Sequence, residues 1–166
     1  RVFCRFYANL RTNISNMQEL NLPKFEAKIR EVKGKQQIFD IIRKKYVALT
    51  PEEWVRQHFI HFMICLGYPA SLMAIETLVI VNSLRQRADI VLYNRRGEPA
   101  LIVECKAPSV TISGETLNQA ARYNIPLKVK YVILTNGLTH FCVELNGSEP
   151  RLLKEFPSYE EINTAD

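Results

Sequence analysis

The sequence has few of the features that mark membrane, disulfide-rich or nucleotide-driven proteins. No apolar stretch in the 166 residues is long enough to span a bilayer, and we expect no secretory signal at the N-terminus. Only four cysteines are present and none forms a CxxC pair, which favours reduced thiols of a cytoplasmic protein over a disulfide framework or a zinc site. These residues also lack a GxxxxGK phosphate loop, so they encode no ATP-driven work.

The composition is that of an ordinary globular domain with a slight basic excess. A hydrophobic fraction of 47% over this length is enough for one domain with a real core. The formal net charge of +5 mildly favours a polyanionic partner. We expect no internal repeat, no membrane association and a cytoplasmic location.

The start of a long helix is the clearest local signal. Thr50 can cap the helix, Pro51 suits its first turn, and Glu53 completes a capping box with Thr50. Apolar residues then recur at helical spacing until a glycine and a proline end the pattern. The predicted helix covers residues 50–66, and its apolar positions are Val55, Phe59, Phe62 and Leu66.

Short apolar runs separated by turn residues predict a mixed sheet after this helix. Strands are expected at 72–82, 87–93 and 100–106, a helix at 114–125, and further strands at 129–135 and 138–145. Consecutive strands with short turns pair antiparallel, whereas the helix between the third and fourth strands makes a parallel crossover. The predicted fold is α/β, with a mixed β-sheet flanked by helices in α-β-β-β-α-β order.

The chain divides into three parts on this interpretation. Residues 1–49 are an N-terminal arm or extension, in which 18–49 form an arm or hairpin. Residues 50–156 form the main domain, and residues 157–166 are a C-terminal tail.

Three charged residues stand inside segments that otherwise resemble buried strands. Asp89 lies in the strand at 87–93, and Glu104 and Lys106 lie in the next strand, where their spacing places them on one face. Two carboxylates and an ammonium in a half-buried position are costly, and a divalent cation shared by the carboxylates would offset that cost. Taken singly, Asp89 fits a strand-end residue, and the other two fit a surface ion pair.

The ordered set of motifs resembles a known family. Asp89, then Glu104-Cys105-Lys106, then Gln119 with Tyr123 one helical turn later, resembles the PD-(D/E)xK nuclease superfamily with its restriction-endonuclease-like core. Within it, the chain is most similar to the N-terminal nuclease domain of type I restriction-enzyme R subunits, and the resemblance covers roughly residues 50–145. Ala88 takes the place of the motif's proline, as alanine does in many members, and the helicase motor of such subunits is absent from these residues.

The resemblance implies a metal-dependent nuclease that hydrolyses DNA phosphodiester bonds in restriction or repair. Asp89 and Glu104, with the backbone carbonyl of Cys105, would hold one or two Mg²⁺ ions, or Mn²⁺ in their place. Lys106 would position or deprotonate the attacking water, or stabilise charge on the phosphate. Gln119 and Tyr123 would orient water or contact phosphate, and the Cys105 side chain would point into the core.

A further acid is expected from the leading helix or the first strand. On a helical wheel Glu52 falls near the inward face, with Arg56 one turn away as its ion-pair partner, whereas Glu53 falls away from it. Glu52 is therefore our catalytic candidate, with Glu53 and Glu76 as alternatives. DNA phosphates would meet basic residues, and these candidates are Arg85, Arg87, Arg95, Arg96, Arg122, Lys128 and Lys130.

Two other functions fit the same sequence. One is a non-catalytic nucleic-acid-binding or interaction module on the same fold, and the other is a structural domain whose charges pair internally. Nucleases of this class also act as homodimers or within larger restriction complexes. The sequence alone sets neither the form of the DNA substrate nor the mode of cutting.

Overall fold

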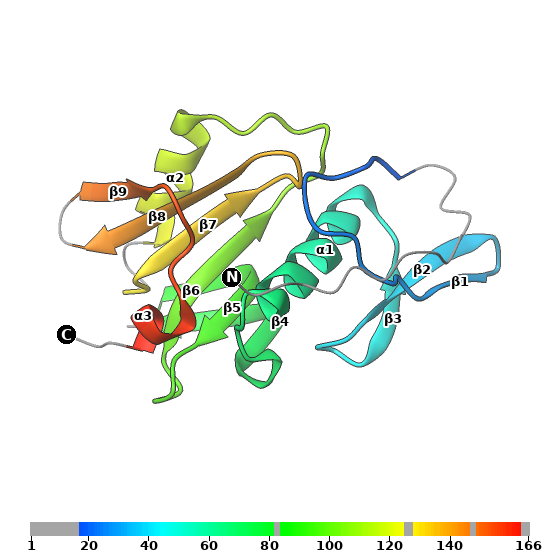
Figure 1. The fold of residues 1–166 in the computed structure, drawn as a ribbon, viewed down its shortest axis with the longest axis horizontal. Helices are drawn as coiled ribbons and strands as arrows, with labels where there is room; N and C mark the ends of the chain where they lie inside the picture. The colour runs from blue at the N-terminus through cyan, green and yellow to red at the C-terminus, as the bar shows by residue number, and fades with distance from the viewer. Residues whose placement is uncertain (1–16, 82–83, 125–127, 147–148, 164–166) are drawn as a thin grey trace.

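A computed structural model describes residues 17–81, 84–124, 128–146 and 149–163. The described chain forms a three-stranded sheet followed by a six-stranded sheet with a helix against each face (Figure 1). The three-stranded sheet consists of β1 (Ile29–Val32), β2 (Lys35–Asp40) and β3 (Lys45–Ala48), all antiparallel. The sequence predicted only an arm or hairpin here.

Helix α1 (Pro51–Cys65) begins where the sequence placed it. The hydroxyl of Thr50 accepts a hydrogen bond of 3.0 Å from the backbone N–H of Glu53, which satisfies one of the N–H groups left open at a helix start. The Glu53 side chain instead bonds Arg43, Arg56 and Gln57. The other bond of the predicted capping box, from the Thr50 N–H to the Glu53 carboxylate, is therefore wrong. A short 3₁₀ helix (Ala70–Leu72) leads into the large sheet.

The large sheet has strands in sequence order. Every neighbouring pair is antiparallel except β6 and β7, which are parallel because α2 (Gly114–Asn124) crosses between them. The left-handed Gly137 (φ 82°) forms the predicted turn between β7 and β8. The strands are β4 (Met73–Val81), β5 (Leu84–Tyr93), β6 (Pro99–Cys105), β7 (Tyr131–Thr135), β8 (His140–Asn146) and β9 (Glu149–Leu153).

The predicted element order and fold class are confirmed, with local differences in length. Strand β5 begins at Leu84 rather than at residue 87, so β4 and β5 form a longer hairpin than expected. A short helix, α3 (Tyr159–Asn163), lies in the predicted tail and buries Ile162. The limits of the three predicted parts stay a prediction.

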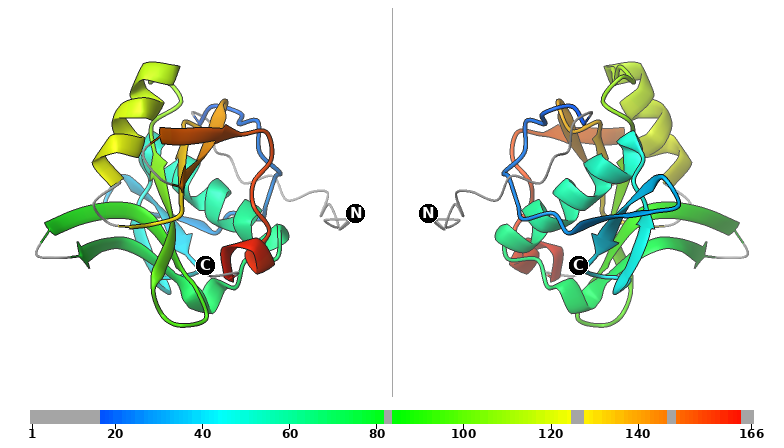
Figure 2. Two further views of the ribbon diagram at one scale, coloured as in Figure 1. Left: turned by 90° about the vertical axis from the view of Figure 1, so that its left-hand side faces the viewer. Right: turned by 90° about the vertical axis from the view of Figure 1, so that its right-hand side faces the viewer.

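The two faces of the large sheet carry separate apolar clusters. On one face α1 packs through residues such as Phe59 and Met63 against β5, β6 and β7. On the other face α2 packs through Leu117 and Ala121 (Figure 2). Cys105 is fully buried on the α1 side, as predicted for its side chain. Within the described residues, no helix is long and apolar enough to cross a membrane.

Candidate active site

The site lies where strand β5 separates from strand β6. The two strands pair from Tyr93 back to Ile90, opposite Val103, whereas β5 stays paired with β4 as far as Leu84. The β4–β5 hairpin therefore leaves the sheet at Asp89 and projects away from the molecule (Figure 2). Continuing the register places Asp89 opposite Glu104, so residues far apart in the sequence meet at this separation.

The carboxylate of Asp89 is held at both oxygens. Its Oδ2 accepts a hydrogen bond of 2.7 Å from the backbone N–H of Cys105, which replaces the strand pairing that ends there. Its Oδ1 accepts a bond of 2.8 Å from Nη2 of Arg56 on α1. The side chain of Asp89 is 18% exposed and that of Arg56 only 4%. The position of this carboxylate is thus fixed by an ion pair and a backbone donor.

Glu104 lies beside Asp89 in a half-buried position. Burial, together with the charges of Asp89 and Glu52, raises the pKa of Glu104 to about 7, although Lys106 and Arg56 act in the opposite direction. Burial is the largest cause of this rise, and the negative charges of Asp89 and Glu52 add to it. The site would therefore favour an additional cation.

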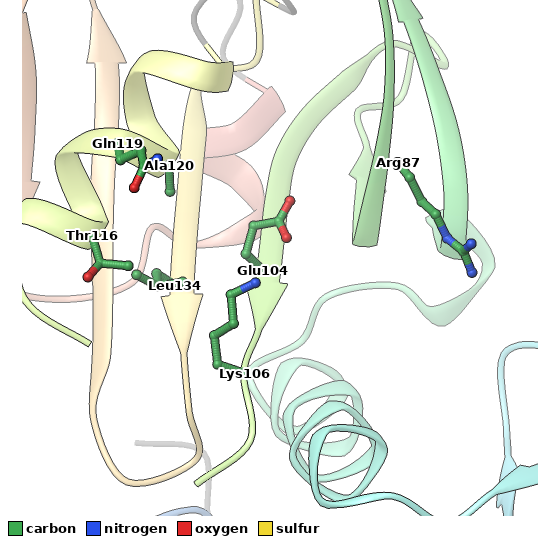
Figure 3. Close-up of a pocket in the computed structure, with 7 residues that line it drawn as sticks. All are labelled: Arg87, Glu104, Lys106, Thr116, Gln119, Ala120 and Leu134. Carbon is green, nitrogen blue, oxygen red and sulfur yellow. The ribbon is translucent and has the colours of Figure 1, made fainter. Parts of the chain in front are cut away.

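A pocket of about 350 Å³ opens beside these groups. Figure 3 shows Arg87 on the hairpin at one side, Thr116 and Gln119 on α2 at the other, and Glu104 with Lys106 between them. Gln119 thus lies at the site from the element that the sequence predicted. Tyr123 belongs to α2, but its side chain lies outside the described residues.

The acids of the leading helix are arranged differently from the helical-wheel prediction. Glu53, expected to point away, is only 5% exposed and bonds Arg43, Arg56 and Gln57. The helical-wheel prediction is wrong because the N-terminal sheet covers a side of α1 that the wheel treats as exposed. Glu52 is half exposed and forms an ion pair of 3.0 Å with Arg56. This pairing was the alternative to a catalytic role for Glu52.

Glu76, the third candidate acid, lies opposite Asp89 across β4 and β5. Its backbone has a left-handed φ of 48°, which is uncommon for a side chain of this size. Its carboxylate contacts Arg43 at 2.6 Å and Arg87 at 3.0 Å. Glu76 therefore links the N-terminal sheet to the projecting hairpin.

Two arginines supply the internal cations of the site, a role that no pattern in the sequence predicted. Arg43 bonds Asp40, Glu53 and Glu76, and Arg56 bonds Glu53 and Asp89. Arg56 was noted only as a partner of Glu52, and no spacing in the sequence marks Arg43. The sequence holds one indirect signal for Arg56. Glu53 and Arg56 are three residues apart on the predicted helix, and this spacing predicts an ion pair.

The predicted basic residues fall into different regions. Arg87 lines the pocket, and Arg85 lies further along the same strand. Arg95 lies at the opposite end of β5, where it pairs with Glu160 at 2.7 Å. Arg96 lies in the same distant turn, whereas the Arg122 side chain is outside the described residues. Lys128 is exposed and Lys130 lies just before β7, at the end of the sheet opposite Lys106.

The donor set suits a hard divalent cation. Asp89 and Glu104 offer carboxylate oxygens, and Mg²⁺ commonly binds one or two carboxylates while keeping several waters. The negative charges of Asp89 and Glu52 contribute to the raised pKa of Glu104, and a bound cation would offset them. Within the described residues no group of three His, Cys, Asp or Glu side chains is arranged to hold a metal, so carbonyl, water or phosphate oxygens would complete the coordination.

A mixed sheet of this order, with acids and a lysine at the separation of its second and third strands, defines a restriction-endonuclease-like domain. Residues 51–157 match the family model described as type I restriction enzyme R protein N terminus (HSDR_N). The chain belongs to this family, as the resemblance in the sequence indicated.

One solved structure shares the fold. It is a fragment described as an HsdR subunit of a type I restriction enzyme from Vibrio vulnificus YJ016, with 22% sequence identity and a TM-score of 0.52. The match covers 69% of this chain and 24% of that chain. No curated protein shows significant sequence similarity to the chain.

Proposed function

We propose that this domain is a metal-dependent nuclease that cuts DNA as an endonuclease within a restriction system. The observation that carries the proposal is that Asp89 bonds the Cys105 backbone at the separation of β5 from β6, beside a pocket lined by Glu104 and Lys106. Membership of the restriction-enzyme family supports DNA as the substrate. Buried free thiols such as Cys105 fit a reducing cytoplasm.

Each side chain has a defined task in this proposal. Asp89 and Glu104, with the Cys105 carbonyl, hold Mg²⁺ or Mn²⁺, which when bound polarises the phosphate and lowers the pKa of water. Lys106 stabilises the charge that develops on the phosphoryl oxygens, or in its neutral form accepts the proton of the attacking water. The new bond joins this water oxygen to phosphorus, and the bond to one ester oxygen of the strand breaks.

The surrounding residues bind and orient. Gln119 on α2 orients the water or a phosphate oxygen, and we assign the same task to Tyr123. Arg87, on the opposite side of the pocket, contacts the strand through its phosphates. Glu52 contributes negative charge near Glu104, which strengthens the attraction for a cation. A homodimer or a larger restriction complex would supply the second cut in a duplex.

The test is Mn²⁺-supported cleavage of plasmid, linear, single-stranded and branched DNA. We expect Asp89→Ala, Glu104→Gln and Lys106→Ala to abolish cutting, and Gln119→Ala and Tyr123→Phe to reduce it less. The matched controls are Glu98→Gln and Lys154→Ala, exposed residues outside the pocket. Cutting by Glu104→Gln or Lys106→Ala at the starting rate would show that the site is misassigned.

A second candidate is a binding module that no longer cuts. The observation that favours it is that both oxygens of Asp89 already accept hydrogen bonds, from Arg56 and from the Cys105 N–H. A module of this kind would bind DNA without cleavage, and Mn²⁺ would leave its unfolding midpoint unchanged.

A further inference from the structure

The outer face of the three-stranded sheet carries aromatic and basic side chains together. The inner face carries Ile29, Ile38 and Val47, which are cross-strand partners and belong to the same apolar cluster as Trp54. Because side chains alternate along a strand, the neighbouring positions point outward. These outer positions are Lys28, Arg30, Gln37, Phe39 and Tyr46.

The two aromatic rings lie side by side beneath cations. Phe39 and Tyr46 pair across the strands with ring centroids 5.2 Å apart. The Arg30 guanidinium lies 4.0 Å above the Tyr46 ring, while its Nε donates a 2.8 Å hydrogen bond to Gln37. Lys28 lies 5.8 Å from the centre of the Phe39 ring. Arg30 is exposed, so the outer face of its planar group is open to a ligand.

This sheet concentrates positive charge at the surface. Between residues 28 and 48 the exposed ionisable residues are six cations and one acid, Glu31. The cations are Lys28, Arg30, Lys33, Lys35, Lys44 and Lys45. The remaining two charges of the segment, Asp40 and Arg43, pair with each other on the inner side at 2.6 Å.

The apolar clusters of the described chain do not account for the outer aromatic pair. Phe39 and Tyr46 are half-buried and belong to none of the three clusters found there. They also precede residues 51–157, which match the family model. Packing of the matched domain therefore gives no reason for two aromatic residues at these positions.

We propose that this outer face, which we name the β1–β3 platform, binds single-stranded nucleic acid. Its cations would contact the phosphates, and unstacked bases would stack on Phe39 and on the Arg30 guanidinium, which Tyr46 supports from below. A duplex would offer the phosphates but not the base faces. A second copy of this chain would place the outward cations Lys28, Arg30 and Lys35 against the same three cations, and the platform offers no acid pattern for a basic peptide.

This inference goes beyond the proposed nuclease because it assigns binding to residues outside the pocket. The test uses the whole chain in EDTA, so that no cutting occurs. The probe is a fluorescent oligothymidylate of about 15 nucleotides, comparable to single-strand site sizes, with a duplex of equal length for comparison. Binding is followed by anisotropy over a series of salt concentrations.

We expect Tyr46→Leu, which keeps an apolar side chain, to weaken binding of the single strand by on the order of tenfold. Arg30→Gln should weaken it as well, and should reduce the slope of log affinity against log salt by about 0.7. The controls Arg151→Gln and Lys154→Gln remove exposed cations elsewhere and should bind like the starting protein. If Tyr46→Leu loses its fold by circular dichroism, Phe39→Leu and Arg30→Gln still carry the test.

Equal binding by the platform variants and the starting protein would overturn the inference, as would tighter binding of the duplex. Equal losses of affinity in the control variants would also overturn it, because they would indicate binding by the positive charge of the whole surface rather than by the platform. A dimer in sedimentation experiments that Tyr46→Leu abolishes would assign the face to self-association instead. Single-strand binding without Mn²⁺-dependent cutting would refute the nuclease alone, and cutting without platform binding would refute this inference alone.

Discussion

Replacing Glu104 by glutamine should make the protein more stable at neutral and alkaline pH. Burial and the nearby charges of Asp89 and Glu52 raise the pKa of Glu104 from 4.5 to about 7. The folded state therefore binds more protons than the unfolded state between these two values. Stability contributed by the protonated Glu104 is present below about pH 4.5 and is lost as pH rises through 7.

The size of the effect follows from the same two values. At about pH 8 an ionised Glu104 would cost about 3 kcal/mol of folding stability, at 1.36 kcal/mol for each unit of pKa difference. At about pH 5.5 the cost is only about 1 kcal/mol, because most of the folded protein is still protonated there. The stability advantage of Glu104→Gln should thus grow by about 2 kcal/mol across this interval.

Urea unfolding gives the required comparison, because urea leaves the ionic strength unchanged. The free energy of unfolding of both proteins is measured at several pH values in EDTA, with Glu98→Gln as the control for removing an exposed carboxylate. Mn²⁺ at alkaline pH should stabilise the starting protein and not Glu104→Gln. A stability difference between the two proteins that does not change with pH would refute the assigned environment of Glu104.

Three further changes test other parts of the structure. Arg56→Met should lower the free energy of unfolding by about 3–5 kcal/mol in urea, because it removes the cation from buried Glu53 and from Asp89; a loss below about 1 kcal/mol, as for a surface pair, would contradict this. Gly137→Ala should cost at least about 1 kcal/mol in the same assay, since φ is 82° and the new Cβ would lie 2.7 Å from Leu20; unchanged stability would contradict the turn geometry. Burial lowers the pKa of His58 from 6.5 to about 4, so its neutral form stabilises the fold above pH 6.5 and this contribution is lost as pH falls through 4; a His58→Gln variant with the same acid sensitivity in urea unfolding would argue against it.

The fold was predictable where local signals and long-range pairing agree. The Thr50-Pro51 helix start, the Asn136-Gly137 turn and the apolar runs each specify one kind of element. The parallel pairing of β6 with β7 then follows from the intervening helix. The length of the β4–β5 hairpin was not predictable, because Arg85 and Gln86 interrupt the apolar pattern that marks a strand.

The site was predictable in its motif residues and not in its counter-ions. Asp89, Glu104 and Lys106 stand out because charges interrupt apolar strands. Glu53 shows the limit of a helical wheel, which uses the positions of one helix and ignores what covers it. Arg43 lies in the turn between β2 and β3, and its ion-pair partners come from three different elements. No spacing along the chain predicts such contacts.

A chain of ion pairs connects the platform to the candidate active site. Asp40 follows Phe39 on β2, so one residue points outward to the platform while the next points inward. Burial alone would raise the pKa of Asp40, but hydrogen bonds from Arg43 and Gln57 hold it below its usual value, so the carboxylate remains charged and paired. Arg43 continues the chain of ion pairs to Glu53 and Glu76.

The position of the N-terminal sheet and the environment of Asp89 therefore depend on the same buried charges. Arg43 pairs with Glu53, and Glu53 also pairs with Arg56, which holds Asp89. Because buried charges that lose a partner are costly, the small sheet cannot leave α1 without leaving Glu53 short of one cation. A strand bound on the platform would thus be held at a fixed place relative to the pocket, which a flexible arm would not provide.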